Sequence, residues 1–230
     1  MRYLRNFSDF ILEGRRSKWD SLSSHLTKQI FSQWVKEING RKKTSTFSES
    51  VESPGIEFDI FATLEKGGMG FEITDRTGAN SDDWDRVDED VAVTPHINIE
   101  FKIKKDWLPE YWSEIYYNLL DVVRHEIEHI TQGGESIGNY RKGKPFEDDE
   151  GYRLMIKEGL LPQHYYLLLP KEVDANLQGL RFEAKKRREP MKATVNRYLK
   201  TQDYLTRTSK QQVLESWRKR ARQIGGIPRF

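Results

Sequence analysis

The sequence of 230 residues contains no cysteine. Disulfide bonds, metal sites with thiolate ligands and a cysteine nucleophile are therefore excluded, and the chain suits any redox compartment. Long apolar runs are missing as well, because no stretch approaches the ~18 apolar residues that a membrane span needs. Residues 1–7 lack the continuous apolar core of a secretory signal. We expect neither membrane association nor secretion through a signal peptide.

A large excess of one charge is also missing, since the formal net charge is only +2. This near balance hides an uneven distribution. Residues 183–230 hold fourteen basic and four acidic residues, so they carry about +10 and the rest of the chain about −8. We expect this segment to dock an acidic protein partner. Nucleic acid is the weaker alternative, because no pattern of stacking aromatic residues accompanies the charge.

Bulky side chains, in contrast, are abundant. Six Trp, ten Tyr and eleven Phe supply enough apolar volume for a hydrophobic core. The length fits one domain, or one domain with substantial appendages.

One stretch carries a recognisable arrangement of chemical groups, His125-Glu126-Ile127-Glu128-His129, which has the pattern H-E-x-x-H. Between Pro109 and Gln132 apolar residues recur at steps of three and four, which predicts a helix that the two glycines at 133 and 134 end. The apolar residues of this pattern are Trp112, Ile115, Tyr116, Leu119, Leu120, Val123, Ile127 and Ile130.

On such a helix the two histidines, four residues apart, project from one face and can bind one zinc ion. Glu126 follows the first histidine, where it can act as a general base toward a zinc-bound water without ligating the metal. The alternative is a surface helix that carries this short motif by chance. The apolar face beside the histidines favours the zinc site.

The N-terminal half outside this motif combines helix and strand patterns. Residues 1–38 predict two helices separated by Gly14, and the polar residues 39–54 predict a linker. Alternating apolar residues predict strands at 56–62 and 69–73, joined as a hairpin by a Gly-Gly turn.

Two further segments precede the motif. Alternation predicts a strand at 97–103, where an extended substrate could add by backbone pairing. Residues 75–90 form an acidic loop, which is solvated or, as an alternative, binds calcium.

The C-terminal part predicts helices. Residues 171–183 form one helical segment, and the tail continues as a helix around Tyr198, a polar break near 207–209 and a basic helix around Trp217.

Catalytic zinc takes three protein ligands and keeps one position open, so a third ligand is needed. Three acids compete for this place: Glu135 six residues after the second histidine, Glu172 at the start of a later helix, and Asp174. Asp174 is two residues after Glu172 and would point about 200° away from it on a helix.

The H-E-x-x-H motif followed by Glu172-Val173-Asp174-Ala175-Asn176 resembles the gluzincin arrangement of zincin metallopeptidases, including the ImmA/IrrE-like metallopeptidases. The resemblance spans roughly residues 95–185. It implies that His125, His129 and Glu172 ligate zinc and that Glu126 is the base.

A second resemblance concerns residues 2–13, which are similar to N-terminal segments of proteins of large tailed bacteriophages. It implies a cytoplasmic or virion-associated location. A zinc hydrolase also needs a group that stabilises the oxyanion, and His164, Tyr165 and Tyr166 are the nearest candidates before Glu172.

These patterns predict an α+β, zincin-like fold in which a small, mainly antiparallel sheet packs on the H-E-x-x-H helix, with added N- and C-terminal helices. The expected parts are an N-terminal helical segment and linker at 1–54, a metallopeptidase core at 55–182, and a basic helical extension at 183–230. The expected function is zinc-dependent hydrolysis of a peptide or protein substrate. The alternative is a phage virion or assembly protein that retains such a fold for structure or binding.

Overall fold

The structure is a computed structural model of the chain. It describes residues 7–40, 46–53, 56–65, 71–79, 95–104, 112–131, 147–224 and 226–230. Within these ranges, side chains are described for residues 18–32, 35–36, 97–100, 102, 112–131, 151–224 and 226–230.

Helices dominate, and this corrects the predicted fold class. About 80% of the residues with described side chains are helical, and the strand residues among them all belong to one strand, at 97–102. The predicted α+β, zincin-like fold, in which the helices are additions to a sheet, is therefore wrong. The physical reason is that the helices after residue 147 bury apolar residues against one another and so form a core of their own.

The chain divides into two compact units, which are described separately. One unit comprises residues 1–22 and 145–230, and the other comprises residues 23–144. The division falls within the first helix, α1 (Phe7–Gly40), which runs through Gly14 without a break. The predicted interruption there is wrong, because a single glycine costs a helix only about 1 kcal/mol and does not end it. The predicted domain boundaries at 54 and 182 are not tested by this division and stay a prediction.

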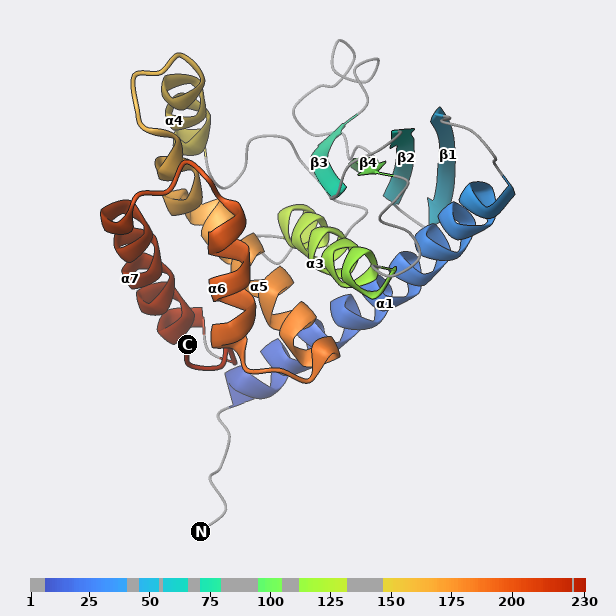
Figure 1. The fold of residues 1–230 in the computed structure, drawn as a ribbon. Helices are drawn as coiled ribbons and strands as arrows, with labels where there is room; N and C mark the ends of the chain where they lie inside the picture. Colours follow the sequence, from blue (N-terminus) through green and yellow to red (C-terminus); the bar gives the residue numbers. More distant parts are fainter. Residues whose placement is uncertain are drawn as a thin grey trace, which may run out of the picture. The chain divides into compact units, whose positions relative to one another are not determined.

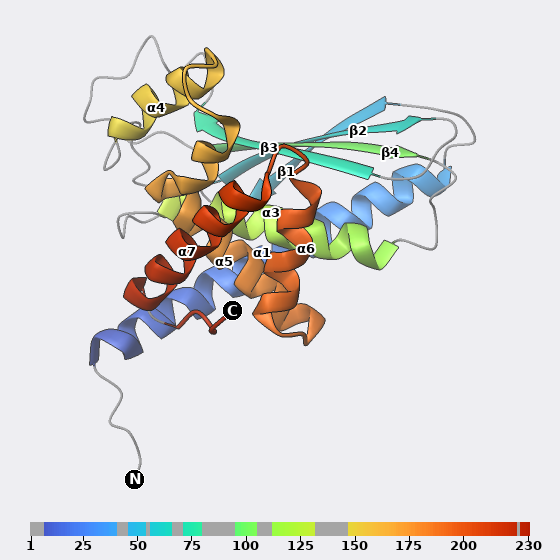
Figure 2. The same ribbon diagram turned by 60° about the vertical axis from the view of Figure 1, so that its left-hand side comes forward.

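The unit of residues 23–144 contains a four-stranded sheet (Figure 2). Its strands are β1 (Thr46–Ser53), β2 (Ile56–Glu65), β3 (Phe71–Ala79) and β4 (Pro95–Lys104), in the order β1-β2-β4-β3. The outer pairs are antiparallel and the central β2–β4 pair is parallel, so the sheet is mixed. Helix α3 (Trp112–Thr131) contacts β3.

Three predictions about these strands are wrong. The polar segment 39–54 contains strand β1 in addition to the end of α1, because backbone hydrogen bonds to β2 pair an edge strand whatever its side chains. Strands β2 and β3 do not form the predicted hairpin, since β4 lies between them. β4 is paired on both sides, so its backbone cannot accept an extended substrate. The predicted acidic loop at 75–90 begins too early, because residues 75–79 belong to β3. Residues 80–90 lie outside the described residues.

The second half of α1 packs on α3 within this unit. Phe31 makes edge-to-face contacts with Trp112 and Tyr116, with ring centroids 5.8 and 5.2 Å apart. Most of the apolar stripe of α3 is buried, as are Ile97 and Ile99 of β4. The fully buried residues of the stripe are Ile115, Leu119, Leu120, Val123 and Ile127. This packing keeps one face of α3 in the core and so fixes the rotation of the helix about its axis.

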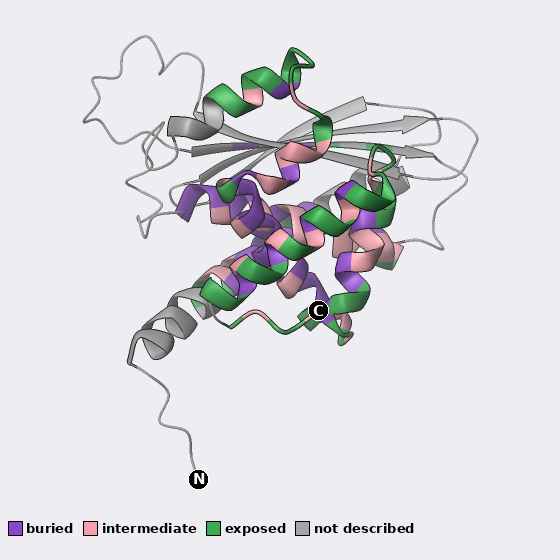
Figure 3. Ribbon diagram, turned by 90° about the vertical axis from the view of Figure 1, so that its left-hand side faces the viewer, coloured by how far each residue is buried: buried purple, intermediate pink, exposed green. Residues whose placement is uncertain are grey.

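The other unit contains α4 (Glu147–Lys157), a 3-10 helix η3 (Gln163–Leu168), α5 (Pro170–Arg187), α6 (Met191–Thr201) and α7 (Arg207–Ile224). Helices α6 and α7 lie beside α5 (Figure 1). Their inward faces are buried and their outer faces exposed (Figure 3). The core contains Leu167, Val173, Leu177, Leu180, Ala184, Met191, Val195, Leu199, Val213, Trp217 and Ala221. The predicted helices of the tail are confirmed. The predicted break near 207–209 is wrong, because α7 begins at Arg207 and residues 202–206 separate it from α6.

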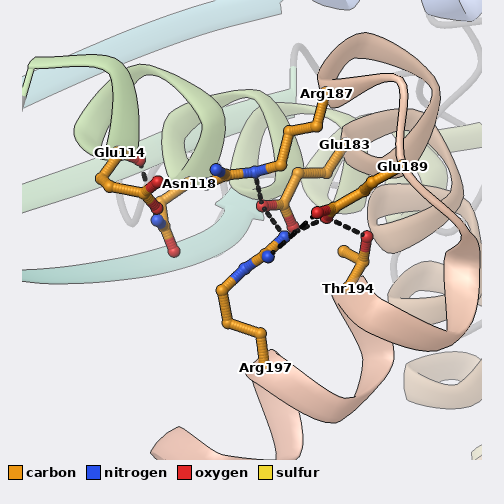
Figure 4. A network of polar contacts seen from close by, with 7 residues as sticks. All are labelled: Glu114, Asn118, Glu183, Arg187, Glu189, Thr194 and Arg197. Atoms are coloured by element: carbon orange, nitrogen blue, oxygen red, sulfur yellow. Dashed lines mark hydrogen bonds and ion pairs between the residues drawn. The ribbon is translucent and has the colours of Figure 1, made fainter.

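Part of the basic charge after residue 183 is paired with acidic residues within this unit. Arg220 donates two hydrogen bonds of 2.6 Å to the carboxylate of Asp174. The buried carboxylate of Glu183 accepts hydrogen bonds from Arg187 and Arg197, and Arg197 also bonds Glu189 (Figure 4). Burial raises the pKa of Glu183 although both arginines act to lower it. These pairs join the end of α5 to α6. Docking of an acidic partner by the remaining basic residues stays a prediction.

In the described part of the chain, no helix combines the length and apolarity that crossing a membrane requires.

Trp217 is fully buried, and its indole N–H donates a 2.8 Å hydrogen bond to the Leu167 carbonyl. We predict that Trp217→Phe lowers the free energy of unfolding by about 2 kcal/mol, because it leaves a buried acceptor without its donor and creates a small void. Urea denaturation measures the change. Leu160→Ala is the control, since Leu160 is 70% exposed and should cost less than about 0.5 kcal/mol. Equal stabilities of the two variants would contradict the role of Trp217.

Arg188 ends α5 in the left-handed region, with φ 58° and ψ 40°. A side chain disfavours this backbone, which glycine adopts freely. We predict that Arg188→Gly raises the free energy of unfolding by roughly 0.5–1 kcal/mol in thermal or urea denaturation. Arg188→Ala removes the same charge but keeps the strain, so it should bring no such gain. If both variants gain equally, the removed charge and not the backbone is responsible.

Candidate metal centre

The predicted H-E-x-x-H helix is confirmed as α3, which ends with the motif in its last two turns. Ile127 and Ile130 are buried here, so the apolar stripe continues past the first histidine and holds the end of the helix in the core. The Thr131 hydroxyl donates a 2.8 Å hydrogen bond to the Ile127 carbonyl, which supports the last turn. The sequence thus folds locally so that both histidines stand on regular helix.

The two histidines converge. Their Nε2 atoms lie 2.9 Å apart, and their rings meet edge to face with centroids 4.6 Å apart. Two unprotonated ring nitrogens at this distance would direct their lone pairs at each other, so the pair requires a shared proton or a shared cation. A metal ion bound by both imidazoles would supply such a cation.

Glu126 lies beside this pair and is almost completely buried. Its Oε1 is 3.8 Å from Nε2 of His125. The carboxylate is therefore held at the same end of α3 as the ring nitrogens, although its position in the motif turns it away from their common face. The predicted role of Glu126 as a general base stays a prediction.

The neighbouring charges of α3 pair along the helix. Arg124 is buried and its guanidinium lies 2.8 Å from Glu128, whose side chain is 19% exposed. This spacing of four residues is the favourable one for an ion pair on a helix. Glu128, the second acid of the motif, therefore balances a buried arginine.

Glu172 lies in the first turn of α5, two residues after Pro170, which starts the helix. The residue is fully buried. Its carboxylate gains from the positive end of the helix dipole, and its carbonyl accepts a 2.8 Å hydrogen bond from the Asn176 amide. The sequence prediction of a helix that begins near Glu172 is confirmed.

Two residues of the same unit surround this carboxylate. Arg153 of α4 forms an ion pair with Oε1 of Glu172. The Arg153 guanidinium also lies over the Tyr166 ring, 5.1 Å from its centroid, and donates a 3.4 Å hydrogen bond to the Tyr166 hydroxyl. Burial, and then the nearby Glu172 carboxylate, raise the pKa of Tyr166 well above its usual range, so the phenol stays protonated.

His125, His129 and Glu172 form a group that could hold a metal ion. Each offers one ligand atom, and these atoms all lie within 4.8 Å of one another. Two imidazole nitrogens and one carboxylate oxygen fit the preferences of zinc and leave a coordination position for a substrate or water.

The competing third ligands are placed differently. Asp174 is engaged with Arg220 by two 2.6 Å hydrogen bonds, so its carboxylate already has a cation. Glu135 lies outside the described residues. Of the oxyanion candidates, His164 stacks on Tyr165 with ring centroids 4.7 Å apart, and Tyr166 joins Arg153 near Glu172. Their catalytic role stays a prediction.

Sequence reasoning missed Arg153. It lies 19 residues before Glu172, in a segment whose other basic residues give no reason to single it out. The structure reveals it through Glu172, because a carboxylate at a buried helix start needs a positive partner.

Comparison with protein-family models, with curated proteins and with solved structures found no match to this chain.

Proposed function

We propose that this protein is a zinc-dependent peptidase that hydrolyses peptide bonds in a peptide or protein substrate. The observation that carries the proposal is the convergence of ligand atoms from His125, His129 and Glu172 within 4.8 Å of one another. The buried Glu126 beside them supplies the fourth functional group. The resemblance to the gluzincin arrangement supports the reaction type through the motif residues.

The choice of metal rests on the donor set. Two histidines and one glutamate make up a known ligand set of catalytic zinc. The same donors also suit Fe(II) in oxygenases. The buried carboxylate of Glu126 lies beside the ligand group without belonging to it. It favours hydrolysis, because an oxygenase needs no such base at this position.

The residues divide the chemistry between them. The zinc, when bound, polarises the scissile carbonyl and makes the attacking water more acidic. Glu126 accepts a proton from that water and then delivers it to the leaving amine nitrogen, so that no net proton is gained or lost at the carboxylate. Tyr166, kept protonated by its surroundings, is the oxyanion candidate best suited to donate a hydrogen bond.

We predict one zinc ion per chain in protein purified without added metal, measured by elemental analysis. His129→Ala should abolish binding, because a single histidine and a carboxylate hold zinc far more weakly than three ligands. His25→Ala, at an exposed position of α1, is the matched control and should keep the metal. Unchanged zinc content in His129→Ala would exclude this site, and iron in place of zinc would argue against hydrolysis.

We further predict that Glu126→Gln keeps its zinc but loses peptide hydrolysis by about 10²–10⁴-fold, because an amide cannot accept the proton of the attacking water. Cleavage of a library of internally quenched fluorescent peptides measures the rate. Glu158→Gln, at an exposed position, is the control for the loss of one acid. Wild-type cleavage by Glu126→Gln would show that Glu126 is not the base. A wild-type protein that binds zinc but cleaves no peptide would favour a structural or binding role.

A further inference from the structure

We propose that Arg153 is a positioning residue for the metal centre: it holds the carboxylate of Glu172 by one oxygen and so orients the other oxygen as a metal ligand. This inference rests on the proposed function, because it requires Glu172 to ligate the metal. It concerns a residue that the H-E-x-x-H motif does not include.

Arg153 contacts the Glu172 carboxylate directly. Its Nη2 pairs with Oε1 of Glu172, a side chain that is 1% exposed, whereas the arginine side chain is 38% exposed. A planar guanidinium fixes the direction as well as the charge of a carboxylate, since its N–H groups have a rigid geometry. The carboxylate can then rotate little about its last side-chain bond, which a ligand with a defined coordination direction requires.

Tyr166 in turn fixes the position of the Arg153 guanidinium. Its ring lies under the guanidinium at 5.1 Å, and its hydroxyl accepts a 3.4 Å hydrogen bond from Nη1 of Arg153. The two ends of the guanidinium therefore have different partners, Nη1 the phenol and Nη2 the carboxylate. A long, half-exposed arginine is thereby kept in one conformation, which reduces the entropy lost when it orients Glu172.

The helix that bears Arg153, α4, is itself held in place. Ile156 is buried and anchors the helix, and α4 contacts η3, which contains Tyr166. The helix ends at Lys157. Gly159 follows with φ 72°, and the amide of Leu160 donates a 2.8 Å hydrogen bond to the Met155 carbonyl. This C-terminal cap is a rigid stop. Arg153 therefore projects from a helix whose rotation and end are both fixed.

The same contact allows the opposite role, in which Arg153 competes with the metal for Glu172. The two roles predict opposite signs. A positioning arginine raises metal affinity, and residues that orient a ligand in this way typically contribute a factor of about 10–100. A competing arginine lowers metal affinity. The arrangement of Tyr166, which locks the guanidinium onto the carboxylate, favours positioning.

The test is the zinc affinity of the full-length variants, measured by competition with a chromophoric chelator. Arg153→Met should bind zinc about 10–100-fold more weakly than the wild type. Arg153→Lys keeps the charge without the planar fork and should recover only part of the loss. Tyr166→Phe keeps the ring and should cost a few-fold. Lys157→Met, at an exposed position on the same helix, is the control and should bind like the wild type.

A double-variant cycle separates positioning from a general structural effect. If Arg153 acts through Glu172, Arg153→Met should not weaken zinc binding further when Glu172 is already replaced by Gln. Additive losses would overturn the proposal, as would unchanged or tighter binding by Arg153→Met. Should that variant not fold, as judged by circular dichroism, Arg153→Lys and Tyr166→Phe decide the question with the same readout.

The controls also separate this inference from the proposed function. If the wild type and His129→Ala bind zinc equally, the metal centre itself is wrong. If His129→Ala loses zinc while Arg153→Met binds like the wild type, the centre stands and only the role of Arg153 is wrong.

Discussion

The convergence of two imidazoles on α3 is the constraint on which the candidate centre depends. Their Nε2 atoms lie 2.9 Å apart, and only regular helix brings residues 125 and 129 to the same face at this spacing. The centre therefore needs α3 to remain helical up to its last turn, where helices tend to fray. The buried Ile127 and Ile130 prevent this, so the apolar packing of α3 is a condition for the chemistry of its polar face.

The sequence predicts local secondary structure well. The helix with the motif, the start of α5 near Glu172 and the helices around Val195 and Trp217 follow from spacings of three and four residues. The sheet was predicted less well, because strand order depends on pairing between distant segments. Residues 56–62 and 69–73 look like a hairpin, yet β4 lies between them. Alternation within a strand gives its faces but not its neighbours.

The C-terminal segment shows a second limit of reading sequences by composition. Its charge of about +10 predicts a solvated surface. Its few apolar residues at helical spacing nevertheless make up much of the hydrophobic core that α5, α6 and α7 share. The fully buried Trp217 outweighs many exposed charges in folding energy, because burial of a large aromatic side chain is worth several kcal/mol, whereas an exposed ion pair is worth about 0–1 kcal/mol. Charge counts therefore predict solvation better than architecture.

The three proposed ligands also differ in the free energy that their burial costs before any metal is bound. A neutral histidine can be partly buried at little cost, and the pair on α3 can share a proton. Glu172 is fully buried, and an ionised carboxylate in that position needs a cation of the protein's own. Arg153 meets this need from α4. The acidic ligand is thus the one member of the group whose burial already requires a second residue, and this explains why a motif search that starts from the metal does not reveal that residue.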